Sequence, residues 1–251
     1  MISNKIRFKN VSFKYPETNL YALKNVDFTI QPGKTLGIVG KTGSGKSTVL
    51  ELITRSYDVT SGEIYLDNKL LNLYSLKCLR SNISYVPQNA FLFSDTILEN
   101  IKFGNYNASN IDVTTVAKNS SIHLDISNFK DKYDTLLGER GVNLSGGQIQ
   151  RITIARALLK KSKILILDDS LSSVDAKTEK NILSNIKKIK KDETVIIVSH
   201  KISSVLHSDL ILVLDKGIII EKGTHNKLIS NGGFYKKLAE KQLENIDSIK
   251  I

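Results

Sequence analysis

The chain begins with alternating apolar and polar positions, which is the two-residue period of a half-buried β-strand. Ile6, Phe8, Val11 and Phe13 are the apolar positions of the first stretch, and the alternation from Ala22 to Ile30 stops at Pro32-Gly33, a turn signal. Residues 60–68 show the sequence of turn, strand and turn once more. These stretches predict an antiparallel β-subdomain near the N-terminus.

Other apolar runs show no alternation. Four of them have the length of a strand: 36–39, 164–167, 195–198 and 210–214. Uninterrupted strands are typical of a sheet that is covered on both faces, and such sheets are mainly parallel. Ile83 to Val86 adds a shorter strand, and 218–221 forms a hairpin with 210–214 around Lys216-Gly217.

Residues 91–161 change to helical periodicity, with helices predicted over 96–101, 109–118 and 149–159 and polar loops between them. We expect a helical subdomain at about 91–161, inserted into a core formed by 1–90 and 162–251, with residues 1–251 as one domain. The predicted fold class is therefore α/β, with a mainly parallel sheet, an antiparallel β-subdomain and an inserted α-helical subdomain.

Composition narrows the class of protein without identifying it. The chain is long enough for a full core, and Cys78 is its only cysteine, which excludes an internal disulfide. No secretory signal is visible, and no apolar run approaches the about 20 residues of a membrane span, so we expect a soluble, cytosol-facing protein. Lys and Arg total 36 against 25 Asp and Glu, a formal net charge of +11. A solvated lysine-rich surface explains this charge; a membrane or nucleic acid is the alternative, although no nucleic-acid module is recognisable.

The strand at 36–39 runs into a glycine-rich loop and then a helix. Gly40 to Thr48 reads Gly-Lys-Thr-Gly-Ser-Gly-Lys-Ser-Thr, the spacing of a phosphate-binding loop. Its glycines let consecutive backbone N–H groups turn inward, and the helix beginning near Lys46 adds its dipole and unpaired amides. Lys46 can reach the outer phosphates, and the Ser47 hydroxyl suits Mg²⁺. A chance match is the alternative, but the strand and helix favour a nucleoside triphosphate.

Polar residues follow other predicted strands at their carboxyl ends, where ligands bind in open α/β sheets. These residues are Gln88, Asp168, Asp169 and His200. Alone, each has an ordinary interpretation, such as a turn aspartate or a structural histidine. Downstream of a phosphate loop, Asp168 is better interpreted as an anchor for Mg²⁺. Tyr15, an aromatic at a strand end, either stacks on an adenine ring or packs on the surface, and alone the second interpretation is favoured.

A second glycine-based anion site is predicted where the last helix of the helical block begins. Ser145 is a natural N-cap, and Gly146 and Gly147 let the backbone approach an anion closely. This site lies far along the chain from the phosphate loop, so one chain is not expected to bring both to the same phosphate. We therefore expect a second copy to supply one of them.

In this order, the motifs resemble the nucleotide-binding domain of an ATP-binding cassette (ABC) transporter, over nearly the whole chain. The phosphate loop matches Walker A, Gln88 matches the Q-loop, and Tyr15 matches the aromatic A-loop. The segment from Leu144 through Gln148 matches the signature, and the segment from Ile164 through Asp168 matches Walker B. The segment from Ser172 through Asp175 matches the D-loop, and His200 matches the switch histidine. The intact Leu-Ser-Gly-Gly-Gln is highly specific, and the A-loop match favours adenine stacking. The resemblance implies a P-loop NTPase with a RecA-like core.

The resemblance also implies a role for each matching residue, with ATP and Mg²⁺ as cofactors. The implied ATP-binding residues are Tyr15, Gly40, Thr42, Gly43, Ser44, Gly45, Lys46, Ser47, Thr48, Gln88, Ser145, Gly146, Gly147 and Gln148. The implied metal ligands are Ser47, Gln88 and Asp168, and the implied catalytic residues are Lys46, Gln88, Asp169 and His200. The family mechanism implies a head-to-tail dimer in which each ATP lies between one chain's Walker motifs and the other's signature, and hydrolysis lets the domains part.

Two stretches resemble the exporter branch of the family. Phe91 to Ile101 follows the Q-loop, and Gly138 to Gly141 precedes the signature, where exporters contact the membrane domain. Exporters usually fuse this domain to six membrane helices, so we expect a C-terminal portion of a half-transporter at the cytoplasmic face of the cell membrane. Its expected partners are a transmembrane domain and a second nucleotide-binding domain, and no specific nucleic acid is expected.

Asp169 stands where the family has its catalytic glutamate. Aspartate is shorter by one methylene, so its oxygens retract by roughly 1.5 Å, and a misplacement of about 1 Å costs on the order of 100-fold in rate. We expect this site to bind MgATP well and hydrolyse it slowly, unless a backbone shift lets Asp169 work normally. In the family, such a substitution is typical of the degenerate half of a heterodimer, whose signature completes the active site of a non-identical subunit. Smaller departures are Lys201, where arginine is common, and Ile149, where a second glutamine is common.

Two other functions stay open. A soluble ABC-type ATPase acting on DNA or ribosomes carries a coiled-coil insertion or a second cassette, and the sequence shows neither a heptad block nor a second phosphate loop. An importer ATPase with separate membrane subunits would fit a chain that starts naturally at Met1, whereas Gly138 to Gly141 disfavours it. The motifs do not encode the transported substrate, the direction of transport or the identity of the partner.

Overall fold

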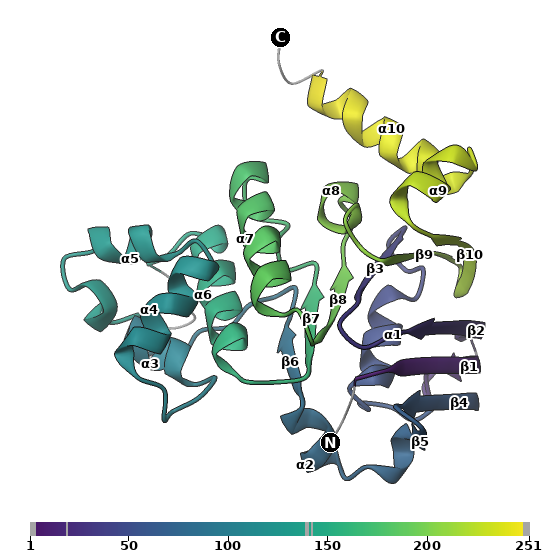
Figure 1. The fold of residues 1–251 in the computed structure, drawn as a ribbon, viewed down its shortest axis with the longest axis horizontal. Coiled ribbons are helices and arrows are strands. Elements are labelled where there is room, and N and C mark those ends of the chain that lie inside the picture. Colours follow the sequence, from purple (N-terminus) through teal and green to yellow (C-terminus); the bar gives the residue numbers. More distant parts are fainter. Residues whose placement is uncertain (1–3, 19, 139–140, 142, 248–251) are drawn as a thin grey trace.

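The computed structural model describes residues 4–18, 20–138, 141 and 143–247, whose strands form two sheets (Figure 1). The larger sheet has the order β10-β9-β3-β8-β7-β6. Its strands are β3 (Thr35–Gly40), β6 (Ile83–Val86), β7 (Ile164–Asp168), β8 (Thr194–Val198), β9 (Leu210–Asp215) and β10 (Ile218–Gly223).

The larger sheet is parallel from β9 to β6, and β10 pairs with β9 in the antiparallel direction. Every residue of β7 and β8 is buried, as their uninterrupted apolar patterns predicted. This confirms the mainly parallel sheet. Because parallel strands end at the same edge, the segments that follow β3, β6, β7 and β8 lie together there.

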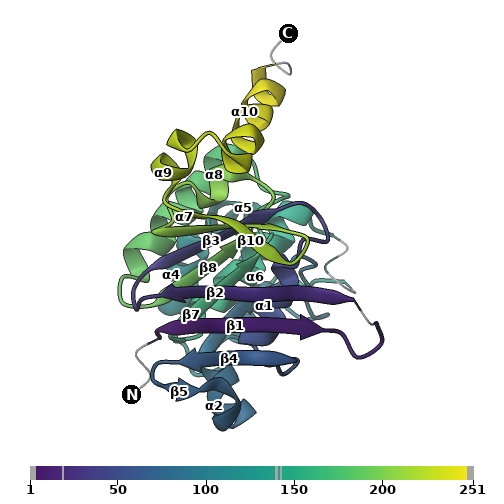
Figure 2. The ribbon, with the colours of Figure 1, turned by 90° about the vertical axis from the view of Figure 1, so that its right-hand side faces the viewer.

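The smaller sheet is antiparallel and has the order β2-β1-β4-β5 (Figure 2). Its strands are β1 (Ile6–Lys14), β2 (Tyr21–Ile30), β4 (Ser61–Leu66) and β5 (Lys69–Leu70). The rings of Phe8 and Phe28 stack across β1 and β2 with centroids 4.5 Å apart. Helix α1 (Lys46–Ile53) contributes Val49 and Leu50 to the apolar core that both sheets share. Helix α1, which follows the phosphate loop, therefore packs against residues of both sheets.

A group of helices follows β6 in the chain and lies beside β6 and β7 (Figure 1, left). Its members are α3 (Ile97–Lys102), α4 (Asn110–Asn119), α5 (His123–Asn128) and α6 (Gly146–Leu159), with the 3₁₀ turn η2 (Lys132–Asp134). Ile101, Val113 and Ile152 are fully buried where α3, α4 and α6 pack together. The predicted α/β fold class is confirmed, whereas the domain boundaries near 91 and 161 stay predictions.

The remaining helices flank the sheets. They are α2 (Leu76–Ser81), preceded by the 3₁₀ turn η1 (Leu71–Leu73), α7 (Ala176–Ile189), α8 (Ile202–Val205), α9 (His225–Ser230) and α10 (Phe234–Asp247). Tyr235 of α10 is fully buried, and its hydroxyl lies 2.9 Å from Nδ1 of His225. Within the described part of the chain, no helix combines the length and the apolar character needed to cross a bilayer.

Candidate functional site

The glycine-rich loop joins β3 to α1, and two of its positions admit only glycine. Gly40 has φ 155° and Gly45 has φ 101°, both in the region that side chains avoid. A Cβ on Gly40 would lie 2.2 Å from the carbonyl oxygen of Leu214, and one on Gly45 would lie 2.7 Å from that of Ala22. Gly45 is also the N-cap of α1 and offers no side chain to its first-turn amides. These amides are therefore left for an anion.

Lys46 lies at the start of α1 with only 6% of its surface exposed. Its Nζ donates to the carbonyl oxygens of Gly40 at 2.9 Å and Lys41 at 2.8 Å. Burial lowers the pKa of Lys46, and the charges of Asp169 and Asp168 oppose that shift. An ammonium has three donors, so these two bonds fold the side chain over the loop and leave one proton for a ligand.

The carboxylates that end β7 are both buried. Asp168 accepts a hydrogen bond on Oδ2 from the Tyr85 hydroxyl at 2.7 Å, a contact that the sequence did not predict. Burial raises the pKa of Asp168, while the hydrogen bond from Tyr85 opposes the rise. A cation at this place would remove the cost of keeping the buried carboxylate charged.

Asp169 meets Gln88 and His200, the other two residues predicted at strand ends. Its Oδ2 accepts from Gln88 Nε2 at 3.4 Å, and its Oδ1 accepts from the His200 backbone N–H at 3.3 Å and the Ser199 hydroxyl at 3.4 Å. The backbone of Asp169 has φ 44°, a left-handed conformation in which aspartate is enriched. The side chain is thus directed to the end of β8.

The segment around His200 is also held by the C-terminal helix α10. One amide of Gln242, in α10, accepts from the Ile202 backbone N–H at 2.8 Å and donates to the His200 carbonyl oxygen at 2.7 Å. Sequence reasoning missed this contact, because nothing in the pattern of α10 marks Gln242.

Tyr15 follows β1 directly and is half-buried. Its hydroxyl lies 2.9 Å from Oγ1 of Thr48 and donates to Glu51 at 2.6 Å, so the ring is fixed beside α1. Burial and the bond to Glu51 raise the pKa of Tyr15 to about 12, which keeps the hydroxyl protonated. The ring makes edge contacts with Phe13 and Tyr57.

The predicted second anion site is the N-terminus of α6. Ser145 and Gln148 form a capping box: the Ser145 Oγ accepts from the Gln148 N–H, and the Ser145 N–H donates to Gln148 Oε1. The Gln148 amide also donates to Asp125 at 3.1 Å, and Arg151 forms a bidentate pair with Asp125 at 2.8 and 3.0 Å. Ser145 and Gly146 are exposed. The turn is therefore rigid and faces outward.

The two anion sites do not meet within one chain. In Figure 1 the start of α1 and helix α6 lie on different sides of β7 and β8. The structure thus assembles the phosphate loop, Asp168, Gln88, Asp169 and His200 at one edge and leaves the α6 turn apart. In the segment 138–141, Glu139 and Arg140 lie outside the described residues.

The assembled edge fits a triphosphate with Mg²⁺. Among the described residues, the Ser44 hydroxyl is buried in the loop without a hydrogen-bond partner, which a phosphate oxygen would supply. No group of three or more His, Cys, Asp or Glu side chains gathers there in the described part of the chain. That is expected for Mg²⁺, which takes one or two protein oxygens and completes its shell with phosphate and water.

A groove of about 680 Å³ lies next to the site, between the residues around β6 and those of α6. Phe91 and Phe103 line it and are each 48% exposed, and Tyr85 and Pro87 line it beside the Q-loop. Arg156 also lines it, and its guanidinium lies 5.6 Å from the Phe103 ring centre. Exposed aromatic side chains beside an arginine are typical of a protein docking surface.

Comparisons with known proteins agree with this geometry. A family model described as ABC transporter matches residues 23–172. The uncharacterized ABC transporter ATP-binding protein YknU of Bacillus subtilis is 48% identical over 248 residues, 99% of this chain and 42% of that protein. The ATP-dependent lipid A-core flippase of Photobacterium profundum is 43% identical over 238 residues, 94% of this chain and 41% of that protein.

A solved structure gives the same result. A bacterial Atm1-family ABC exporter with ATP bound matches with a TM-score of 0.91 and 37% identity, over 96% of this chain and 42% of that chain. The chain thus spans less than half the length of each of these three proteins.

Proposed function

The chain belongs to the ABC transporter family, and from that premise we propose that it is the ATP-binding and ATP-hydrolysing module of an exporter. ATP-binding domains of this family are ATPases coupled to transport. The observation that carries the proposal is the meeting of the phosphate loop, Asp168 and the Gln88, Asp169 and His200 group at one sheet edge. Similarity to exporter-type proteins favours an exporter over an importer or an ATPase acting on nucleic acid.

In this proposal, the described edge holds ATP and Mg²⁺. Lys46 and the loop amides bind the phosphates, with the Ser44 hydroxyl as a further donor. Ser47, Gln88 and Asp168 bind Mg²⁺, which supplies charge neutralisation on the phosphate oxygens when it is bound. Tyr15, fixed by its bonds to α1, offers a ring to the adenine.

The exposed turn of α6 completes the site of a second copy or subunit. Ser145 and Gly146 face solvent and α6 begins there, so its free amides and dipole attract an anion from outside the chain. The capping box with Gln148 and the pair of Arg151 with Asp125 keep the turn ready for that anion. We infer a head-to-tail dimer, in which hydrolysis removes the bridge between the copies.

Gly146→Asp tests directly whether the α6 turn contacts the nucleotide held by a second copy. A Cβ on Gly146 meets nothing nearer than Ser173 at 3.8 Å, so the side chain fits, and an acidic group in the first turn favours the helix. The same charge repels a phosphate. We expect this variant to bind MgATP as a monomer like the wild type, and to lose at least about 10-fold in MgATP-driven pairing, measured by analytical ultracentrifugation.

Gly146→Asn is the matched control, because it adds the same volume without the charge. It should pair more strongly than Gly146→Asp. If Gly146→Asp pairs as the wild type does with MgATP, the α6 turn does not contact the nucleotide and the dimer proposal is wrong.

Adenine stacking predicts a separate effect at Tyr15. Stacking on an aromatic ring is worth about 1–3 kcal/mol per base, so Tyr15→Ala should lower ATP affinity by about 5-fold to about 150-fold. Affinity for inorganic tripolyphosphate should not change, because it has no base. Tyr15→Phe keeps the ring and loses the bonds to Thr48 and Glu51, and should retain most of the ATP affinity. Titration calorimetry with both ligands distinguishes a stacking ring from one that only positions α1, since the latter loses both affinities.

We also propose that the chain's own site hydrolyses ATP slowly and serves as the degenerate half of a heterodimer. The support is Asp169, which stands where the family has glutamate and is directed to the end of β8. The intact α6 turn then completes the hydrolytic site of a non-identical subunit. Mixing this chain with a candidate partner domain should raise ATP turnover above the sum of the two separate rates.

The membrane partner is proposed to dock in the groove lined by Phe91 and Phe103. The relatives extend well beyond the part that this chain matches, which leaves room for a transmembrane domain in the whole protein. Its cytoplasmic segments would fill the groove, and the module would work at the cytoplasmic face of the cell membrane.

A further inference from the structure

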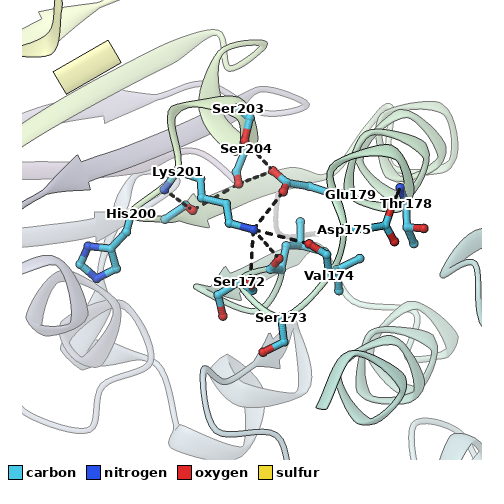
Figure 3. A network of polar contacts seen from close by, with 12 residues as sticks. Ser172, Ser173, Val174, Asp175, Thr178, Glu179, His200, Lys201, Ser203 and Ser204 are labelled. Carbon is cyan, nitrogen blue, oxygen red and sulfur yellow. Dashed lines mark hydrogen bonds and ion pairs between the residues drawn. The ribbon is translucent and has the colours of Figure 1, made fainter. Parts of the chain in front are cut away.

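Glu179 is a buried carboxylate that the proposed nucleotide chemistry does not use. It contacts the segment that follows His200. The side chain of Glu179, in the first turn of α7, is 3% exposed. Its Oε1 accepts from the hydroxyls of Ser203 at 3.0 Å and Ser204 at 2.6 Å (Figure 3). Its Oε2 lies 3.6 Å from Nζ of Lys201. A buried carboxylate requires such partners, because an unpaired charge without water is costly.

The ammonium of Lys201 also binds the backbone of the loop after β7. Its Nζ donates to the carbonyl oxygens of Ser172 at 3.1 Å and Val174 at 3.5 Å (Figure 3). It also donates to that of Leu171 at 3.4 Å. Lys201 directly follows His200 in the loop after β8. One cation therefore joins the loops that leave two neighbouring strands.

The loop at 171–174 contacts the start of α6 on another side. The Ser173 backbone N–H donates to Gln150 Oε1 at 3.2 Å. A Cβ on Gly147 would lie 2.9 Å from the Ser173 carbonyl oxygen, so α6 and the loop pack backbone to backbone. The loop is thus in contact with both the α6 turn and Lys201. The loop therefore connects the segment that carries His200 with the α6 turn of the same chain.

We propose that Lys201 is a positioning residue, whose ammonium, neutralised by Glu179, holds the 171–174 loop between His200 and the α6 turn. A side-chain cation with several donors suits this task, because it can serve several carbonyl oxygens at once and pair with Glu179. The contact links the chain's own nucleotide site to the surface that it offers to a second copy. This effect on pairing rests on the proposed function.

Hydrogen exchange of the full chain without nucleotide tests the positioning role. Lys201→Met removes the charge and keeps the length of the side chain, so the amides of 171–175 and 199–204 should exchange at least about 10-fold faster. The amides of β7 should stay as protected as in the wild type, which shows that the fold is intact. Lys180→Met, an exposed position on α7, is the matched control and should change neither segment.

Two further variants separate charge from shape. Lys201→Arg keeps a cation with several donors and should restore slow exchange. Glu179→Gln keeps an acceptor for Ser203 and Ser204 but no longer neutralises Lys201, and should loosen the same two segments. Unchanged exchange in Lys201→Met, or equally fast exchange in Lys201→Arg, would overturn the proposal.

Pairing gives the second readout. With MgATP, Lys201→Met should bind nucleotide with the affinity of the wild type and pair about 10-fold more weakly. Equal pairing of Lys201→Met and the wild type contradicts the link to the α6 turn. If the wild type itself neither binds ATP nor pairs, the proposed function fails, while the exchange experiment still decides whether Lys201 holds the loop.

Discussion

Lys46→Ala is expected to lower the affinity of the chain for MgATP by about 30-fold to about 4,000-fold. Losing one partner of a buried, hydrogen-bonded charge pair costs about 2–5 kcal/mol, and each 1.4 kcal/mol is about tenfold. Lys46 is buried, and its bonds to Gly40 and Lys41 place its ammonium over the glycine-rich loop. Titration calorimetry with MgATP measures the loss.

The stability of the fold should not fall in the same variant. Burial lowers the pKa of Lys46, so the folded chain holds the proton less tightly than the unfolded chain does. At neutral pH the charged lysine therefore costs stability, and thermal unfolding of Lys46→Ala should occur at the wild-type temperature or higher. Lys41→Ala is the control: it is exposed, it keeps the carbonyl that Lys46 binds, and it should bind ATP almost normally. Normal ATP affinity in Lys46→Ala would show that the loop does not bind phosphate.

Asp169→Glu is expected to raise the ATP turnover of the chain by about 10-fold to about 100-fold. The added methylene extends the carboxylate by roughly 1.5 Å, and a base must lie within about 2.6–3.2 Å of the water that it activates. In the wild type, the carboxylate is directed to the end of β8 by bonds from Ser199 and His200. The left-handed backbone at this position disfavours glutamate somewhat, so a small loss of thermal stability should accompany the gain in rate.

Asp169→Asn separates the effect of the carboxylate charge from the effect of side-chain length. It has the shape of the wild type without the carboxylate, so it should show no gain in turnover, while the affinity for MgATP stays close to normal. Steady-state phosphate release and single-turnover measurements record both quantities. If the wild type alone already hydrolyses ATP as fast as an ordinary transporter domain, and Asp169→Glu changes nothing, the slow-site proposal is wrong.

The place of the glycine-rich loop between a strand and a helix was predictable because its signals are local. Lys46 and Ser47 fall within nine consecutive residues between a strand and a helix, and those elements are β3 and α1. The positions of Asp168 and His200 at one sheet edge were predictable because each comes at the end of an uninterrupted apolar strand, and parallel strands end at one edge. Their roles stay predictions. The same signals gave the α/β class and the mainly parallel sheet, which are confirmed.

Contacts between residues far apart in the chain could not be predicted. Tyr85 binds Asp168, and Arg151 binds Asp125, yet neither tyrosine nor arginine stands in a spacing that marks the contact. Helix α8 was missed because its four residues are too few to show a helical period. Helix α5 was missed because its apolar residues, Leu124 and Ile126, are two positions apart, which is not a helical spacing. The roles of Gly146 and Gly147 stay predictions, since they concern a contact with a second molecule. The domain boundaries near 91 and 161 also stay predictions, since they concern whether the helical subdomain is a separate unit of the fold.

The contacts of Gln242 make helix α10 part of the functional domain of this chain. All recognisable motifs lie before residue 201, so a minimal fragment designed from motifs alone would discard α10 as a mere appendage. Yet one side chain of that helix closes two hydrogen bonds on the backbone at His200 and Ile202. A chain truncated before α10 would keep every motif, but the segment that carries His200 would lose these two hydrogen bonds.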